Sequence, residues 1–419
     1  MGIKSESSPE VFTEIVNTAA DLTNLFKDNG FRLYFVGGIV RDLLLGYKPD
    51  VQDLDCTTDA SPKEIKRIVQ PIADAVWLQG ERFGTVGMRV NGTNYEITTH
   101  RAESYVDDSR KPVVNFSTNL SDDLIRRDFT VNAMAVDTAT GELFDPYGGV
   151  KDLEEMTLRT PMDPEESFTD DPLRILRAAR FIAAYGFSPT GDLLQAAQKI
   201  SERLNIVSIE RIRDEIFRLL SVEDPRLGLK FLSASKTASY VFPEVFELSE
   251  ERQEMLFNQV SLVEAEPLMR LAVFKEMIPD SRLRSFRLSS KELVYVEKIR
   301  NALVLLEKND QNDWSDAKFR RLAFDTEGAL DDVVRIWERI FPKNLTVINE
   351  LKRLNEAGEF TTFEPFFDGE TIMNELGIEP GPDVGTVTDW LISLRIEEGS
   401  LSEEQVKQKL HIWWDQRSK

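Results

Sequence analysis

The spacing of apolar residues changes at about residue 164. Before it, short apolar runs with the alternation of β-strands stand between helical segments, as in residues 32–38, 52–58 and 83–90. After it, apolar residues recur at intervals of three and four, which is the period of an amphipathic helix. The pattern therefore predicts an α+β fold, with a sheet in the N-terminal region and an all-α remainder.

Capping signals place several of the helices. Residues 9–29 predict one amphipathic helix, because Ser8 is a good N-terminal cap and Gly30 a good terminator. Ser61-Pro62-Lys63-Glu64 has the form of a capping box and predicts that another helix begins there. In the second region, helices are expected over residues 170–187, 193–204, 209–220 and 227–235.

Residues 102–118 are too polar for a strand or a buried helix. They contain Asp107-Asp108-Ser109-Arg110-Lys111-Pro112, a run of charged residues that ends in proline. Such a composition predicts a surface loop.

Asp53 and Asp55 are the first candidates for chemistry. They stand two apart on an expected strand, so their carboxylates point to the same face of the sheet. Two carboxylates this close repel each other unless a cation lies between them, which indicates a divalent-metal site. Taken alone, the pair is more typical of acidic residues on a surface or in a turn.

A glycine turn precedes this pair by about twelve residues. Gly37 and Gly38 stand between an expected strand and an expected helix, where backbone N–H groups can approach a phosphate closely. Arg41, one turn into the helix, can add a bidentate phosphate contact. Together with Asp53 and Asp55, the turn supplies what phosphoryl transfer requires. The alternative is a plain tight turn with a solvated Arg41.

Two further segments carry candidate groups. Glu96, on a neighbouring expected strand, could act as a base or support a metal, or it could be an ordinary polar strand residue. In Arg126-Arg127-Asp128, one arginine could hold a triphosphate while Asp128 orients it, and the alternative is an ion-paired helix end. The turn at 145–149 looks structural.

Asp171 and Arg174 suggest recognition of a nucleobase. They are neighbours at i and i+3 at the start of an expected helix. A carboxylate accepts from the exocyclic amino group of cytosine or adenine, and a guanidinium donates to the ring nitrogen beside it. The alternative is that Asp171 only caps the helix, since Pro172 suits a first helical position.

Composition narrows the function classes. The 419 residues predict two to four domains. Cys56 is the only cysteine and His100 and His411 are the only histidines, which excludes zinc sites built from those residues and leaves carboxylates with hard cations. The single cysteine and the lack of long apolar runs predict a cytoplasmic protein with no membrane segment.

The net charge of −22 disfavours a nucleic-acid partner on average. The average hides a local excess of positive charge, because residues 174–218 carry eight basic and five acidic side chains. This segment is therefore a weak indication of a phosphate-facing surface.

In combination, these motifs resemble those of class II tRNA nucleotidyltransferases, the bacterial CCA-adding enzymes of the DNA polymerase beta superfamily. The resemblance covers about residues 30–220 and rests on the order of GGIVRD, DLDCTT, RRDFTVNA, DPYGG, DDPLRILRAARF and ERIRDEIFRLL. Asp170 stands where the family usually has glutamate, and His100 where it often has an aromatic residue.

The resemblance implies a mixed or antiparallel-sheet head followed by a helical neck, body and tail. These would be a nucleotidyltransferase head at 1–155, a base-recognition neck at 156–223, a body at 224–290 and a tRNA-binding tail at 291–419. It also implies two Mg²⁺ ions at Asp53 and Asp55. The resemblance implies that the triphosphate is bound by Gly38, Arg41 and Arg127. It implies that a protein template for CTP and ATP is formed by Asp171 and Arg174, supported by Arg177 and Arg180.

The expected activity is template-independent addition of C, C and A to the 3′ end of tRNA, with release of pyrophosphate and no obligate protein partner. The alternatives within the superfamily are a CC-adding enzyme, an A-adding enzyme and a poly(A) polymerase. Residues 102–118 resemble the flexible loop that CC-adding enzymes lack, and neither the segment at 80–83 nor the tail has the basic character usual in poly(A) polymerases. A non-catalytic RNA-binding protein would be expected to have lost Asp53 or Asp55.

Overall fold

The computed structural model divides the chain into two compact units. The first consists of residues 1–219 and 227–243, and the second of residues 220–226 and 244–419. The residues described are 9–48, 51–78, 80–81, 84–101, 116–308, 314–343, 346–360 and 363–417. Most of the expected loop at 102–118 lies outside them. The finer division into four domains stays a prediction.

A seven-stranded mixed sheet organises the described part of the first unit. In spatial order its strands are β3 (Ala75–Trp77), β4 (Thr85–Val90), β5 (Thr93–Thr99), β2 (Asp53–Thr58), β1 (Leu33–Val36), β6 (Ala135–Asp137) and β7 (Leu143–Phe144). Only β2 and β5 pair in parallel; every other neighbouring pair in this sheet is antiparallel. The predicted α+β fold is confirmed, as is the mixed character of the sheet.

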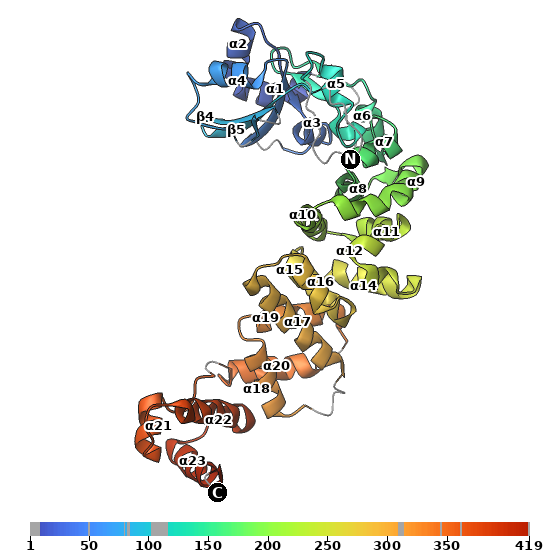
Figure 1. The fold of residues 1–419 in the computed structure, drawn as a ribbon. Helices are drawn as coiled ribbons and strands as arrows, with labels where there is room; N and C mark the ends of the chain where they lie inside the picture. The colour runs from blue at the N-terminus through green and yellow to red at the C-terminus, as the bar shows by residue number, and fades with distance from the viewer. Residues whose placement is uncertain are drawn as a thin grey trace. The chain divides into compact units, whose positions relative to one another are not determined.

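Short helices surround this sheet (Figure 1). They are α1 (Thr13–Thr18), α2 (Ala20–Asp28), α3 (Gly38–Leu44), α4 (Pro62–Val69), α5 (Leu120–Leu124) and α6 (Gly149–Glu154). The expected capping box is present, since the Ser61 hydroxyl accepts from the Glu64 amide and the Glu64 carboxylate accepts from the Ser61 amide. A small hydrophobic core lies on the Tyr34 side of the sheet and includes Val36 and Leu124.

The prediction of one continuous helix over residues 9–29 is wrong. The segment forms a 3₁₀ turn (Pro9–Phe12) and then α1 and α2, which are separated at Ala19. Thr18 and Thr23 donate their hydroxyls to the carbonyls four residues earlier, at 2.9 and 2.8 Å. Such bonds compete with regular helix geometry and bend helices, which explains a break that the apolar periodicity conceals.

Helices take over after residue 163, as predicted. They are α7 (Pro164–Asp170), α8 (Leu173–Tyr185), α9 (Gly191–Ile200), α10 (Ile209–Leu220), α11 (Arg226–Ala234) and α12 (Ala238–Val241). The sequence did not predict the short parallel pair of β8 (Thr157–Leu158) and β9 (Ser188–Pro189). This pair joins the segment before α7 to the segment after α8.

Gly228 allows α11 to lie directly against the backbone of α8. A Cβ atom at this position would be 2.4 Å from the Ala179 carbonyl oxygen and 2.6 Å from a methyl group of Leu219. Neither the carbonyl nor the buried leucine can withdraw easily, because both belong to packed helices. The close approach therefore requires glycine.

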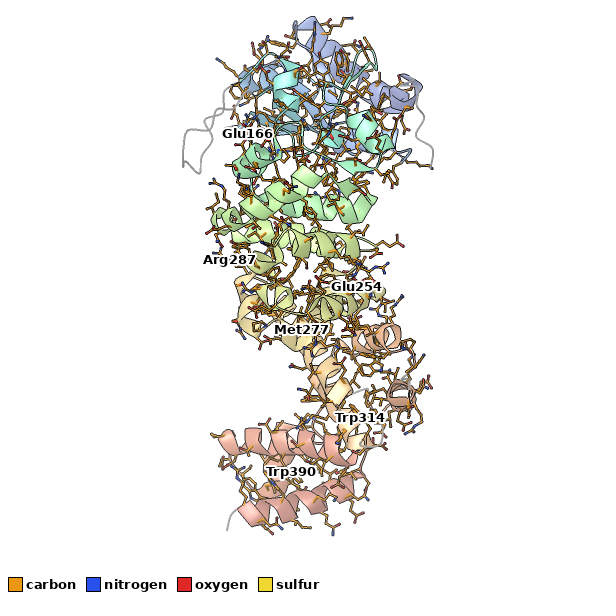
Figure 2. All side chains as sticks on the ribbon, turned by 90° about the vertical axis from the view of Figure 1, so that its right-hand side faces the viewer. Glu166, Glu254, Met277, Arg287, Trp314 and Trp390 are labelled. Carbon is orange, nitrogen blue, oxygen red and sulfur yellow. The ribbon has the colours of Figure 1, made fainter. Side chains whose placement is uncertain are left out.

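The second unit contains no β-strand among its described residues. Its helices include α14 (Glu250–Leu262), α15 (Pro267–Val273), α16 (Asp280–Ser285), α17 (Ser290–Lys308), α18 (Asp316–Asp325), α19 (Leu330–Ile340), α20 (Thr346–Glu356), α21 (Gly369–Leu376), α22 (Pro382–Glu398) and α23 (Glu403–Arg417). Figure 2 shows Trp390 on the side of α22 that faces α23, where its ring stacks on that of Trp413 at 4.7 Å.

Arg270 is the most deeply buried charged residue of the second unit. Its side chain donates to the carbonyls of Val263, Leu220 and Glu223 at 2.8–3.0 Å, and to that of Val222. One guanidinium thus satisfies carbonyl groups at the end of α10 and in the turn after it, which would otherwise lack partners. Within the described ranges, no helix has both the length and the apolar character to cross a bilayer.

Gly228→Ala should lower the free energy of unfolding, because the new methyl group forces α11 away from α8. Overpacking of this kind costs about 1–3 kcal/mol. Urea unfolding followed by circular dichroism measures the change. Gly191→Ala is the matched control, since a Cβ atom there meets nothing within 4 Å. Equal stability of the two variants would contradict the close packing.

Candidate active site

The glycine turn lies at the end of β1. Gly37 has φ 75° and ψ −134°, a conformation that favours glycine, and α3 begins at Gly38. A Cβ atom on Gly37 would be 3.3 Å from Nη1 of Arg127, so this guanidinium lies against the turn. The opening of α3 and the Arg127 cation therefore form one positively polarised surface.

The carboxylates lie on neighbouring strands of the sheet. Asp53 and Asp55 are exposed while Leu54 and Cys56 are buried, which confirms that both acids share one face. The parallel pairing of β2 with β5 places Glu96 directly opposite Asp55. The Asn94 amide donates to Asp53 at 2.8 Å. The structure thus brings together the three acids that the sequence singled out.

Desolvation and the neighbouring negative charges raise the pKa values of two of these acids. Desolvation raises the pKa of Asp55, the Arg127 cation opposes that shift, and the Asp53 charge adds to it. Desolvation also raises the pKa of Glu96, and the charges of Asp55 and Asp53 raise it further. A bound cation would relieve the repulsion.

The geometry fits a metal held jointly with a substrate. Among the described residues, no group of three or more His, Cys, Asp or Glu side chains could hold a metal ion by itself. Mg²⁺ is commonly bound through one or two carboxylates together with water and substrate phosphates, and it does not need an all-protein cage. Asp53 and Asp55 match that donor set.

Arg127 has a different partner from the one that the sequence suggested. Its guanidinium bonds Asp123 at 3.1 Å, while the Asp128 carboxylate accepts from Arg177 and from Asn132. The expectation that Asp128 orients an adjacent phosphate-binding arginine is therefore wrong for Arg127. Asp123 follows Asn119, the N-cap of α5, and lies one helical turn before Arg127, so the pair is a local i,i+4 contact.

Arg41 is buried beside the glycine turn, where a Cβ atom on Gly38 would be 3.4 Å from its Nη2. Its residue is 6% exposed, and its guanidinium donates to Asn132 at 2.6 Å, Tyr185 at 2.6 Å and Asp42 at 2.9 Å. It also lies over the rings of Tyr185 and Phe181. Each of its three nitrogens thus has a protein partner, and direct contact with a phosphate stays a prediction.

The pair of residues predicted to read a base lies at the start of α8. Asp171 accepts from the Leu173 amide at 3.2 Å and pairs with Arg211 of α10 at 2.9 Å. Arg174 donates to the Ser167 hydroxyl at 2.7 Å and to the Arg126 carbonyl at 2.5 Å. The two side chains are therefore held by different partners, and Asp171 caps α8 as well as carrying a charge.

The other two arginines of α8 are turned to a shared acid. Arg177 approaches Glu215 of α10 at 3.6 Å and Arg180 bonds it at 2.9 Å. Glu215 is 4% exposed. The structure therefore ties Arg180 to α10 and away from Asp171, because residues spaced by three drift around a helix.

Sequence reasoning missed three residues of this region. Asn132 and Tyr185 accept hydrogen bonds from Arg41. The sequence shows only that Asn132 belongs to the RRDFTVNA motif and that α8 contains aromatic residues, and it does not indicate a contact with Arg41. Trp77 lies on the same cross-strand row as Glu96, because Gly87 pairs with both. Its indole covers Gly87, where a Cβ atom would clash at 1.8 Å. A glycine inside a predicted strand was the available signal for such a close approach.

Comparisons with known proteins identify the family to which the chain belongs. The poly A polymerase head domain matches residues 33–159, and the probable RNA and SrmB-binding site of polymerase A matches residues 186–248. In solved structures, the CCA-adding enzyme of Bacillus stearothermophilus in complex with CTP is 25% identical, with a TM-score of 0.75 over 97% of this chain and 98% of that one. A Thermotoga maritima CCA-adding enzyme complexed with tRNA shares the fold at 22% identity and a TM-score of 0.69, over 99% and 100% of the two chains.

Sequence relatives extend the match to nearly the whole chain. The CCA-adding enzyme of Lactobacillus helveticus is 42% identical, but that alignment spans only 52% of either chain. The CCA-adding enzyme of Lactococcus lactis subsp. cremoris is 31% identical over 415 residues, which is 96% of both chains. The protein therefore belongs to the CCA-adding enzymes, the bacterial class II tRNA nucleotidyltransferases of the DNA polymerase beta superfamily.

Proposed function

We propose that this protein adds C, C and A to the 3′ end of tRNA, using CTP and ATP, without a nucleic-acid template and with release of pyrophosphate. The observation that carries the proposal is the row of Asp55 and Glu96 on adjacent strands, with Asp53 beside it and the glycine turn and Arg127 nearby. Acids that require a cation and donors that suit a triphosphate are the two halves of a nucleotidyltransfer site.

Membership of a nucleotidyltransferase family implies the use of a divalent metal. We propose two Mg²⁺ ions, held by Asp53 and Asp55. When bound, they would supply Lewis-acid activation of the tRNA 3′-hydroxyl and neutralise charge on the leaving pyrophosphate. Glu96 would hold a proton or support the aspartates from the adjacent strand.

The remaining residues bind and orient the nucleotide. The backbone at Gly38 and the Arg127 guanidinium would contact the triphosphate, with Arg41 beneath them. Asp171 and Arg174 would read the base, because a carboxylate and a guanidinium together match the amino group and ring nitrogen of cytosine and adenine. Arg177 and Arg180 would support that pair from the same helix. Cytoplasmic tRNA is the expected substrate, and no protein partner is required.

Sequencing of products distinguishes this activity from its relatives. With tRNA that lacks the CCA end, the protein should add two C residues from CTP alone and a complete CCA from CTP with ATP. Addition that stops at CC with both nucleotides present would indicate a CC-adding enzyme, and long A tails would indicate a poly(A) polymerase. Binding of tRNA without release of pyrophosphate would indicate a non-catalytic RNA-binding protein.

Asp53→Ala and Asp55→Ala should each abolish the transfer of both C and A while leaving tRNA binding largely unchanged. Both carboxylates are needed to hold the metals, and the RNA-binding surface is elsewhere. Single-turnover transfer and filter binding measure the two properties. Asp74→Ala is the control, since Asp74 is an exposed acid that bonds the Asn91 amide beside the same sheet. Near-normal turnover in either active-site variant would refute the assignment.

Asp171→Ala should allow UTP and GTP to compete with CTP and ATP. Uracil and guanine present a carbonyl where the correct bases present an amino group, and loss of such a paired contact costs about 1–3 kcal/mol of discrimination. The measurement is kcat/KM for each of the four nucleotides.

Asp163→Ala provides the matched control for loss of a helix-end contact. Asp163 is the N-cap of α7 and accepts from the Glu165 amide, two residues on, as Asp171 accepts from the Leu173 amide at the start of α8. If Asp171→Ala behaves like Asp163→Ala and still rejects UTP and GTP, Asp171 only stabilises the helix end.

A further inference from the structure

A continuous chain of buried polar contacts connects α3 with the middle of α8. The Arg41 guanidinium donates to the Asn132 carbonyl oxygen at 2.6 Å, and the Asn132 amide nitrogen donates to Asp128 at 2.9 Å. The other oxygen of Asp128 accepts from Nε and Nη2 of Arg177, at 2.9 and 2.5 Å. These contacts join the helix after the glycine turn to the helix that begins beside Asp171.

Three of the four members of this chain are shielded from water, and the fourth, Arg177, has 31% of its side chain exposed. Asp128, Arg41 and Asn132 are 8%, 6% and 5% exposed. Burial by itself would raise the pKa of Asp128, but the Arg177 charge and the hydrogen bonds from Asn132, Arg177 and the Phe129 amide outweigh it and lower the pKa. Asp128 is therefore an anion held by a cation in an environment where unpaired charges are costly.

Asn132 occupies the one position where a neutral side chain has to serve both neighbours. Its carbonyl oxygen faces the Arg41 cation and its amide nitrogen faces the Asp128 anion, so its orientation is fixed. Aspartate in its place would repel Asp128, and an apolar residue would leave both neighbours without a partner. Asn132 thus connects Arg41 to the Asp128–Arg177 ion pair without adding a charge.

The end of α8 is attached to the same arginine. Tyr185 accepts from Arg41 at 2.6 Å, donates to Asp42 at 3.2 Å, and covers the guanidinium with its ring at 4.5 Å. Arg177 and Tyr185 are eight residues apart, which is about 12 Å along a helix. Two attachments at this separation restrain both the position and the tilt of α8 relative to α3.

We propose that Asn132 is a positioning residue for nucleotide selection, and that Arg41 acts largely through it. The proposal rests on the function proposed above, in which the turn before α3 holds the triphosphate and the start of α8 reads the base. A single nucleotide would reach from the turn before α3, where its triphosphate binds, to the start of α8, where its base is read. The distance between α3 and α8 must therefore stay fixed for the correct base to meet Asp171 and Arg174. Asn132 is the residue through which that spacing is transmitted.

Asn132→Asp should lower kcat/KM for CTP and ATP by roughly a hundred-fold, since misplacement by about 1 Å away from the reacting atoms has effects of that size. It should also reduce the preference for CTP over UTP by about ten-fold, at a temperature where the variant is fully folded. The affinity for tRNA should stay the same. Calorimetric Kd values for CTP and UTP provide a readout that does not depend on turnover.

Asp152→Asn is the matched control. Asp152 is also a buried acid of the first unit, paired with Arg159 at 3.0 Å, but its partners Arg159 and Thr130 lie on neither α3 nor α8. This variant should lose stability and keep the preference for CTP over UTP. If both variants lose stability and neither changes that preference, or both change it equally, Asn132 has only a structural role and the proposal is overturned.

The outcomes for the two proposals can be told apart. A wild-type protein that binds CTP better than UTP but transfers neither C nor A would refute the proposed activity, and the Kd ratios would still test Asn132. A wild-type protein without any preference between the two nucleotides would overturn the role of Asn132 as well.

Discussion

The ion pair between Asp128 and Arg177 is the interaction on which the first unit depends. It joins the segment between α5 and β6 to helix α8, with Asp128 buried and the Arg177 side chain 31% exposed. Loss of Arg177 would leave the buried Asp128 carboxylate uncompensated, and for a fully buried pair such a loss costs about 3–5 kcal/mol, so the arrangement tolerates few alternatives. Asn132, Arg41, Tyr185 and Glu215 extend it in both directions.

The sequence predicts the parts of the site that lie on regular elements better than those that depend on contacts between them. Alternation along residues 53–58 was enough to place two acids on one face, and the register with β5 then brought Glu96 opposite Asp55. The burial of Arg41 was not predictable, because a motif shows which residues are near in the chain and not which rings cover them. The break between α1 and α2 at Ala19 was not predictable for a related reason. Hydrogen bonds from the Thr18 and Thr23 hydroxyls leave the apolar periodicity of the sequence unchanged.

Net charge is a poor guide to this molecule. A net charge of −22 argues against binding of polyphosphates or RNA, yet the region around the glycine turn presents Arg127 and the N-terminus of α3. The acids nearby are not an obstacle to an anionic substrate if cations accompany it, because repulsion among them favours a bound metal. Local pairing, rather than the total, decides what such a surface can bind.

The parallel pairing of β2 with β5, in a sheet whose other neighbours are antiparallel, has a consequence for the order of folding. Parallel neighbours cannot be joined by a tight turn, and here the connection contains α4, β3 and β4. The acidic row therefore forms through contacts between residues 41 positions apart, Asp55 with Glu96. Such distant pairings are slow to form because the intervening chain must first be closed into a loop. On the ribosome, a nascent chain that has emerged only as far as β4 carries both aspartates but cannot yet bring the glutamate beside them.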